Sequence, residues 1–201
     1  MAELLRTHPL EAWTDTFGRL PGAVGITVEP FLAMADVRLG AVGPEVSARL
    51  GVDLPTAPNT WVPTAAGRAI WLGPDEWLLT SAAETPEELE ERLRGVLVPH
   101  GGAAVDVSAQ RISLRLTGER VRDVLARGCA VDLHPRVFGR GSSAQTTLGL
   151  AGVVLLALSD DGDDYGVLVR SSFAGYLADW LLDAALEYTT TDNGTPGSPR
   201  Q

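Results

Sequence analysis

The chain has 201 residues, 45% of them hydrophobic, and a formal net charge of −10 at pH 7, which is enough sequence for one sizeable core or two small packed subdomains. The acidic balance argues against binding to the phosphates of nucleic acid, and no apolar run approaches the roughly 18–20 residues that a membrane helix needs. The lone cysteine excludes an internal disulfide and a multi-cysteine metal site, and the N-terminus lacks the pattern of a secretory signal, so we expect a cytoplasmic protein.

Residues 1–32 show no sustained hydrophobic period. Prolines and glycines interrupt every candidate helix, yet apolar side chains are more frequent than in a disordered tail. We therefore interpret the segment as an extended arm that packs on its own domain or on a partner. Trp13 and Phe17 are the candidate contacts of this arm with a partner.

The next elements have clear local signals. A strand is expected at 33–39 and a short helix at 44–50. Residues 66–81 predict a hairpin, because two apolar runs flank a turn that contains proline at its second position. The helix that follows has the best start signal in the chain, since Thr85 as N-cap and Glu88 at the third helical position form a capping box.

A strand followed by a short helix is predicted in the middle of the chain. Apolar and polar residues alternate over 112–116, which is typical of a strand with one buried face. Over 121–125 the apolar spacing changes to that of a helix, and Gly128 lies at the position of its C-cap. Three arginines are expected on the solvent side of this helix: Arg120, Arg122 and Arg127.

Three further strands are expected at 144–150, 153–158 and 165–170, and a last helix at about 172–187. The helical period of this last segment predicts one continuous buried face, made of Phe173, Tyr176, Leu177, Trp180, Leu181 and Ala184. Residues 189–201 contain no apolar side chain, so we expect a disordered tail.

The order strand–helix–loop–hairpin–helix occurs twice, at roughly 33–98 and 105–187. The repeat is one of pattern and not of residue identity. We therefore predict an α+β fold with one domain at 33–188, made of two alike subdomains at about 33–100 and 103–188.

The arginines are unevenly distributed. All 16 basic residues are arginine, which removes Schiff-base and P-loop chemistry that needs lysine. Seven of them lie between Arg111 and Arg140 with only three acidic residues, so this segment has a charge of +4 in a chain of −10. We predict that it docks on an acidic patch of a partner; the alternative is a solvated surface with ion pairs inside the chain. The candidate docking residues are Arg120, Arg122, Arg127 and Arg136.

No stretch has the pattern of a catalytic or metal site. Gly139–Ala144 fits G-x-G-x-x-A, but a strand and not a helix is expected after it, so we interpret its glycines as loop residues. Asp160–Asp164 lacks the distal glutamate of a calcium loop, and the three histidines are scattered. Cys129 follows a helix C-terminus, which does not activate a thiol. Trp71 and Trp77 either stack on a flat ligand or pack in a core. We predict no catalytic, cofactor-binding or metal-binding residue.

Several stretches between residues 35 and 187 together match the pattern of one family. They are Leu72–Leu79, Asp106–Arg111, Leu116–Gly118, Val124–Phe138, Ala144–Thr146, Val169–Phe173 and the helix that contains Trp180. The most specific of them runs through Asp132–Pro135. In these stretches the chain resembles the gamma subunit of heterotetrameric sarcosine oxidase.

The resemblance implies a fold like the folate-binding domain of aminomethyltransferases, in agreement with the two alike halves. It implies a non-catalytic structural subunit of a complex that demethylates sarcosine oxidatively to glycine. In that complex FAD, FMN, NAD, zinc and tetrahydrofolate would be held by other subunits, and the partners would be the alpha, beta and delta subunits. Two alternatives stay open: a stand-alone tetrahydrofolate-dependent one-carbon or repair protein of the same fold, and a scaffold outside sarcosine metabolism.

Overall fold

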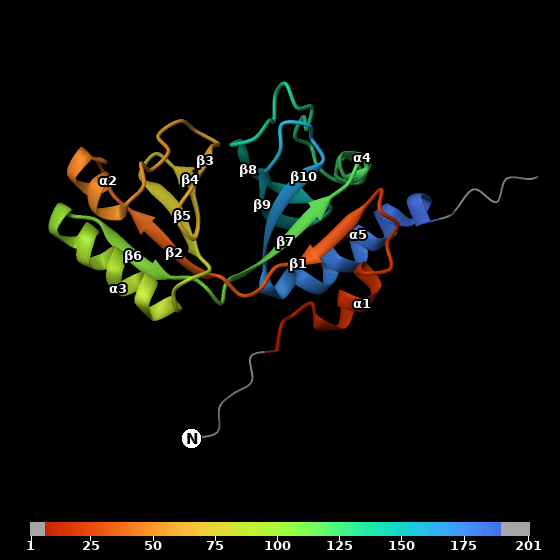
Figure 1. The fold of residues 1–201 in the computed structure, drawn as a ribbon, viewed down its shortest axis with the longest axis horizontal. Helices are drawn as coiled ribbons and strands as arrows, with labels where there is room; N and C mark the ends of the chain where they lie inside the picture. Colours follow the sequence, from red (N-terminus) through yellow and green to blue (C-terminus); the bar gives the residue numbers. More distant parts are fainter. Residues whose placement is uncertain (1–6, 190–201) are drawn as a thin grey trace, which may run out of the picture.

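The computed structural model describes residues 7–189, which form two five-stranded antiparallel sheets packed face to face (Figure 1). The first sheet has the order β3 (Trp61–Pro63), β4 (Gly67–Gly73), β5 (Glu76–Ser81), β2 (Ala33–Arg38) and β6 (Ala103–Asp106). The second has the order β8 (Ser143–Leu148), β9 (Ala151–Ala157), β10 (Asp164–Arg170), β7 (Arg111–Thr117) and β1 (Gly25–Val28).

Helices cover the outer face of each sheet, so the layers follow the order helix, sheet, sheet, helix (Figure 1). The first sheet is covered by α2 (Pro44–Leu50) and α3 (Pro86–Leu97), and the second by α1 (Thr14–Phe17), α4 (Val121–Ala126) and α5 (Ala174–Thr189). The short 3-10 helices are η1 (Glu11–Trp13), η2 (Val98–His100) and η3 (Ser171–Phe173). Within residues 7–189, no helix has the length and apolar character that crossing a membrane requires.

Three apolar cores follow from these layers, because alternate side chains of a strand point to opposite faces of its sheet. Two cores lie between a sheet and its helices. The third lies between the sheets, where Ile70 and Leu78 of the first sheet pack with Leu156 and Leu168 of the second. The central strands are therefore buried on both faces.

Each half of the chain gives its first strand to the sheet of the other half. β1 precedes β2 in the sequence but pairs with β7, and β6 precedes β7 but pairs with β2. Without these two strands the sheet orders correspond, as β3-β4-β5-β2 and β8-β9-β10-β7. Each sheet thus takes four strands from one half and an edge strand from the other.

The linkers that follow the exchanged strands make matching hydrogen bonds. The amide of Glu29, just after β1, donates to the Ser113 carbonyl on β7 at 3.0 Å, and the amide of Val107, just after β6, donates to the Met34 carbonyl on β2 at 2.8 Å. Side chains reinforce both, since the Ser113 hydroxyl donates to the Glu29 carboxylate and the Ser108 hydroxyl accepts from the Met34 amide. Both linkers are thereby fixed where they pass between the halves (Figure 1).

The α+β class with two alike halves is confirmed, and so are the elements with strong local signals. The hairpin at 66–81 is β4 and β5, and the helix at 44–50 is α2. At the start of α3, the Thr85 amide donates to the Glu88 carboxylate at 2.9 Å and the Glu88 amide donates to the Thr85 hydroxyl at 3.2 Å. This is the predicted capping box.

The described part of the N-terminal segment packs on its own domain, one of the two expected alternatives, but it is not extended throughout, because it contains η1 and α1. Leu10, Phe17, Val24 and Ile26 lie in the core of the second half, and β1 forms an edge of its sheet. The described part of the segment is therefore an integral piece of the second half. Residues 1–6 of the expected arm, and residues 190–201 of the expected disordered tail, lie outside the described residues.

Two further boundaries differ. β6 was expected to open the second subdomain, but it completes the first sheet, so the strands of that sheet end at Asp106. The last helix was expected to bury Phe173 and Tyr176, but their exposed fractions are 42% and 39%. The buried face of this helix runs through Ala174, Leu177 and Leu181, because Phe173 belongs to the 3-10 turn before α5.

We expect Phe17→Ala to lower the free energy of unfolding by about 3–5 kcal/mol, as other buried phenylalanine truncations do. Phe17 is 3% exposed inside the second core, so truncation leaves a cavity there. Urea denaturation checks this, with Val137→Ala as the control, since Val137 is 66% exposed. Equal stability of the two variants would show that the N-terminal segment does not dock on the second half in solution.

Candidate functional site

The residues that carry most enzyme chemistry do not converge. Among residues 7–189, no group of three or more His, Cys, Asp and Glu side chains is placed to hold a metal ion. His8, His100 and His134 lie before η1, in η2 and in the loop after α4. Gly139–Ala144 runs through a loop into β8, so its glycines do not open a helix. Asp160–Asp164 covers the turn between β9 and β10 and the first residue of β10. These residues lie mainly in separate loops and turns, and they do not form one site.

Cys129 and the two tryptophans of the hairpin are packing residues. Cys129 is half-buried and packs against the second core. Trp77 is 2% exposed, and its indole N–H donates to the Pro55 carbonyl at 2.7 Å. Trp71 packs partly buried against the same core of the first half. Trp77 therefore presents no open face for a flat ligand, and the Trp71 ring is partly covered.

The candidate docking arginines are divided between paired and unpaired groups. Arg120 precedes α4 and contacts Asp123 at 3.3 Å, and Arg127 follows α4 and pairs with Glu187 of α5. Arg122 and Arg136 make no ion pair with any residue in the described range. Two of the four candidates are thus occupied inside the chain.

The positive charge of the Arg111–Arg140 segment is offset by carboxylates from elsewhere in the sequence. Arg115 binds Asp164 of β10 with two hydrogen bonds, at 2.9 and 2.5 Å. This ion pair and the Arg127–Glu187 pair neutralise two of the positive charges of the segment, with carboxylates that lie outside it in the sequence. The seven arginines therefore do not form one continuous basic surface.

The two apolar candidates from the N-terminal segment also face inward. Phe17 lies in the second core, where no partner reaches it. Trp13 packs against the same core, and its indole N–H donates to the Asp179 carboxylate of α5 at 2.8 Å. Phe17 is therefore removed from the candidate interface, and Trp13 offers only part of its ring.

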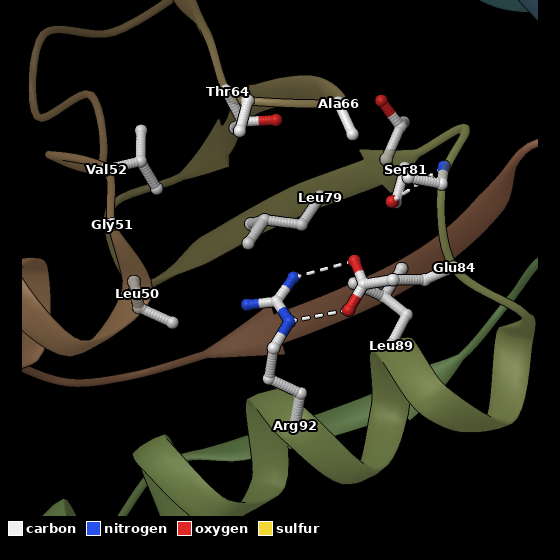
Figure 2. A pocket seen from close by; sticks show the side chains of 13 residues that line it. Leu50, Gly51, Val52, Thr64, Ala66, Leu79, Ser81, Glu84, Leu89 and Arg92 are labelled. Carbon is white, nitrogen blue, oxygen red and sulfur yellow. Dashed lines mark hydrogen bonds and ion pairs between the residues drawn. The ribbon is translucent and has the colours of Figure 1, made fainter.

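One cavity lies under the hairpin of the first half, between β5, the end of α2 and α3 (Figure 2). Its volume is about 270 Å³, and its walls include Leu50, Val52, Leu79 and Leu89. Arg92 and Glu84 close it with a two-point ion pair, in which Nε and Nη2 of Arg92 donate to Glu84 at 2.6 and 2.9 Å. These charged groups already satisfy each other, so they are not available as a free acid or base.

The ion pair shifts the acidity of both groups. The hydrogen bonds from Arg92 hold the pKa of Glu84 below its ordinary value against the opposing effect of burial, and a hydrogen bond from the Ser81 hydroxyl adds to the lowering. The same pair raises the pKa of Arg92. The ion pair therefore joins the segment after β5 to α3 and has a structural role.

A second charged group lies on the inner face of the first sheet. Glu76 contacts Arg38 at 2.8 Å, and Arg38 also lies 3.7 Å from Asp36. Burial raises the pKa of Glu76, and a hydrogen bond with Asp36 raises it further. Both carboxyl groups are engaged with Arg38, and no group of three or more metal-ligating side chains forms around them among residues 7–189.

A hollow lies opposite, on the inner face of the second sheet. Its volume is about 370 Å³, and two arginines, Arg111 and Arg170, stand at one side of it. They occupy directly paired positions on β7 and β10. The sequence signal for this site was weak, because the arginines are 59 positions apart and only the strand register brings them together.

The family model for the "sarcosine oxidase, gamma subunit family" matches residues 34–187 of the chain. The chain is similar to the sarcosine oxidase subunit gamma of Corynebacterium sp. (strain U-96), with 36% identity over 148 residues, 73% of this chain and 70% of the relative. It is also 33% identical over 192 residues to the sarcosine oxidase subunit gamma of an Arthrobacter species, which covers 92% of this chain and 93% of that relative.

Solved structures show the same likeness. A chain of heterotetrameric sarcosine oxidase from Corynebacterium sp. U-96 matches with a TM-score of 0.81 and 30% identity, over 94% of this chain and 98% of that one. The glycine cleavage system aminomethyltransferase T from Bartonella henselae matches with a TM-score of 0.53 and 16% identity, over 84% of this chain and 48% of that one. The second match concerns the fold alone, and it confirms the predicted aminomethyltransferase-like architecture.

We expect Glu84→Gln to lower the free energy of unfolding at pH 7 by about 0.5–1 kcal/mol, since the pair is well oriented but Arg92 is partly exposed. The pKa of Glu84 is lowered in the folded state, so the unfolded state binds more protons and the contribution is present above the ordinary glutamate pKa of about 4.5. It is lost as the pH falls through the folded-state value. Thermal melts from pH 7 to pH 3 should show the variant and wild type converging, and Glu91→Gln, an exposed change on α3, should show no such difference.

Cys129→Ser should preserve assembly and cost at most about 1–2 kcal/mol, because the thiol is half-buried against apolar side chains. Thermal melts measure the cost, and iodoacetamide labelling followed by mass spectrometry measures the reactivity of the native thiol. Rapid labelling that abolishes assembly would contradict a packing role.

Proposed function

The chain belongs to the sarcosine oxidase gamma subunit family, and from this membership we propose that it is a non-catalytic structural subunit of a heterotetrameric sarcosine oxidase. The observation that carries the proposal is the match to a chain of such an oxidase over nearly the full length of both chains, with a TM-score of 0.81. The relatives of this family are named as gamma subunits, so the likeness concerns one component and not a whole enzyme.

The proposed division of labour assigns the chemistry to other chains. Alpha, beta and delta subunits would hold FAD, FMN, NAD, zinc and tetrahydrofolate and would demethylate sarcosine to glycine with oxygen as acceptor, in the cytoplasm. The charged groups of the first half agree with this assignment, because they stabilise the fold in pairs. Arg92 binds Glu84 at the cavity, and Arg38 binds Glu76 on the inner face of the first sheet.

The structure also suits a scaffold. The exchanged strands and their fixed linkers join the two halves into one unit, and a core between the sheets fills the space that remains. A preorganised unit loses little conformational entropy when it binds, which favours a stable position in a complex. The unpaired Arg122 and Arg136 remain proposed contacts with an acidic partner surface.

The alternative of a stand-alone tetrahydrofolate-dependent protein has less support. Its basis is the likeness to aminomethyltransferase T, which at 16% identity shows the fold alone. Retention of tetrahydrofolate by the purified chain without partners would favour it, and this outcome is measured in the experiment below.

We expect the isolated chain to be colourless and to produce no peroxide from sarcosine, with or without added FAD and FMN. Co-expression with its alpha, beta and delta partners, and purification through a tag on this chain, should give a yellow complex that oxidises sarcosine. Absorbance at flavin wavelengths and a peroxide assay check both samples. Peroxide formation that scales with the concentration of the isolated chain, or a tagged chain that retains no partner, would contradict the proposed role.

A further inference from the structure

A mixed apolar and basic surface lies at the end of the second sheet, where β10 passes into η3 and α5. We call it the end surface and define it by Arg111, Leu150, Arg170, Phe173 and Tyr176. Leu150 is 81% exposed, Phe173 42% and Tyr176 39%. Large apolar side chains with this exposure, gathered at one place, mark interaction sites more often than single scattered ones do.

The apolar part of the end surface is held in a defined conformation. The Leu150 amide, in the turn between β8 and β9, donates to the Tyr176 hydroxyl at 3.0 Å. The rings of Phe173 and Tyr176 meet edge to face with 6.4 Å between centroids. Ser171 at the start of η3 is tied to the loop before β7, because its hydroxyl donates to the Ala109 carbonyl at 2.9 Å. The exposed side chains therefore stand on a rigid base, which lowers the entropy cost of binding.

The basic part is a pair of like charges in direct register. Arg170 of β10 is the cross-strand partner of Arg111 of β7, and like charges in this position repel. Arg111 donates to the neutral Gln110 side chain at 2.8 Å. Neither arginine has a carboxylate within 4 Å among residues 7–189, whereas Arg115, four residues after Arg111 on the same face of β7, binds Asp164. Burial lowers the pKa of Arg111, and the charge of Arg170 lowers it further.

A hollow leads from the arginine pair along the inner face of the second sheet. Gly152 of β9 lines the same hollow as Arg170, and a side chain at this position would meet no atom within 4 Å. Thr147 of β8 follows in the same row. The hollow of about 370 Å³ that opens here is wide enough for a short side chain to reach the guanidinium groups. Asp36 and Glu76 of the opposite sheet attract Arg111 from a distance, but both are engaged with Arg38.

We propose that the end surface receives an acidic segment of a partner subunit, with a carboxylate between Arg111 and Arg170 and a neighbouring apolar side chain against Leu150 and Phe173. The inference rests on the proposed subunit role and adds where the contact lies and which chemistry it recognises. The charge of the arginine pair requires an anion, and the exposed rings beside it require a protein and not a free ion. Aromatic residues and arginine are the residue types that dominate binding energy at interfaces.

The end surface shares only Arg111 with the Arg111–Arg140 segment that the charge count indicates. Arg120 and Arg127 have carboxylate partners in the chain, so their binding elsewhere would first break an ion pair. Arg111 and Arg170 can bind a carboxylate without first breaking an ion pair of the described chain. A carboxylate bound between Arg111 and Arg170 would also relieve the repulsion between the two arginines. This repulsion destabilises the free chain, so its relief strengthens the binding of the partner.

The test uses the complete chain and its co-expressed partner subunits. Arg170→Glu and Leu150→Asp should each weaken association by about tenfold or more, measured by biolayer interferometry with the tagged chain immobilised. Arg170→Glu should also flatten the dependence of the on-rate on NaCl concentration, since a steering charge has been reversed. Matched controls lie on the outer helices of the first half: Arg49→Glu at an exposed arginine and Val98→Asp at a 54% exposed valine, both expected within about twofold of wild type.

The outcomes separate this inference from the proposed function. If wild type binds the partners and Arg170→Glu and Leu150→Asp bind equally well, the end surface is not the contact and the subunit role stands. If wild type binds no partner at all, the proposed function fails. Should either variant melt below the assay temperature, Arg170→Gln, which removes one charge without adding another, is expected to weaken binding by about threefold or more.

Two further measurements identify the occupant. Light scattering should show the isolated wild-type chain as a monomer; a dimer that Leu150→Asp dissociates would assign the surface to a second copy and overturn the acidic partner. Succinate should not raise the melting temperature more in wild type than in Arg170→Gln. A selective rise, with partner binding unchanged in the variants, would assign the arginine pair to a small anion.

Discussion

The exchange of first strands is the constraint on which the rest of the structure depends. β1 completes the sheet of the second half and β6 completes the sheet of the first, so neither sheet has its edge until both halves are present. The linkers are short and hydrogen-bonded at both Ser113 and Met34, which fixes the two sheets at a defined distance. The small core between the sheets can then be filled by a few residues, such as Ile70 and Leu168. The N-terminal segment is buried for the same reason, since it leads into β1.

Pairing of charges in three dimensions changes how the sequence must be understood. Along the chain the Arg111–Arg140 segment has a surplus of positive charge, but folding brings Asp164 and Glu187 to Arg115 and Arg127. Arg111, at one end of this segment, has no carboxylate partner among residues 7–189, and its register partner Arg170 lies 59 positions later, outside the segment. In a chain with a net charge of −10, an arginine that has no carboxylate partner indicates where an acidic partner could bind.

The parts of the fold that local chemistry determines were predictable from the sequence. A capping box at Thr85 and Glu88, the proline turn of the hairpin and the two helix periods each act within a few residues. The strand exchange was not predictable in this way, because β1 has only four residues and its partner is distant. Phe173 and Tyr176 fit the helical period but lie outside the buried face. Phe173 belongs to the 3-10 turn η3, and the buried face of α5 runs through Ala174, Leu177 and Leu181 beside Tyr176. The end surface depends on the strand register and on that turn, so the sequence pattern alone does not predict it.

The exchanged strands also govern the order of events during synthesis. Gly25 of β1 pairs with Thr117, which is 92 residues later in the chain. At ~5–20 residues per second the ribosome needs roughly 5–20 s to produce this partner, so β1 and the apolar residues before it wait unpaired during that time. The first sheet waits as well, because its β6 edge is made just before β7. Neither half is a finished folding unit when it leaves the ribosome, and a nascent chain of this family therefore has a period in which shielding by chaperones, or early contact with a partner subunit, protects its open strand edges.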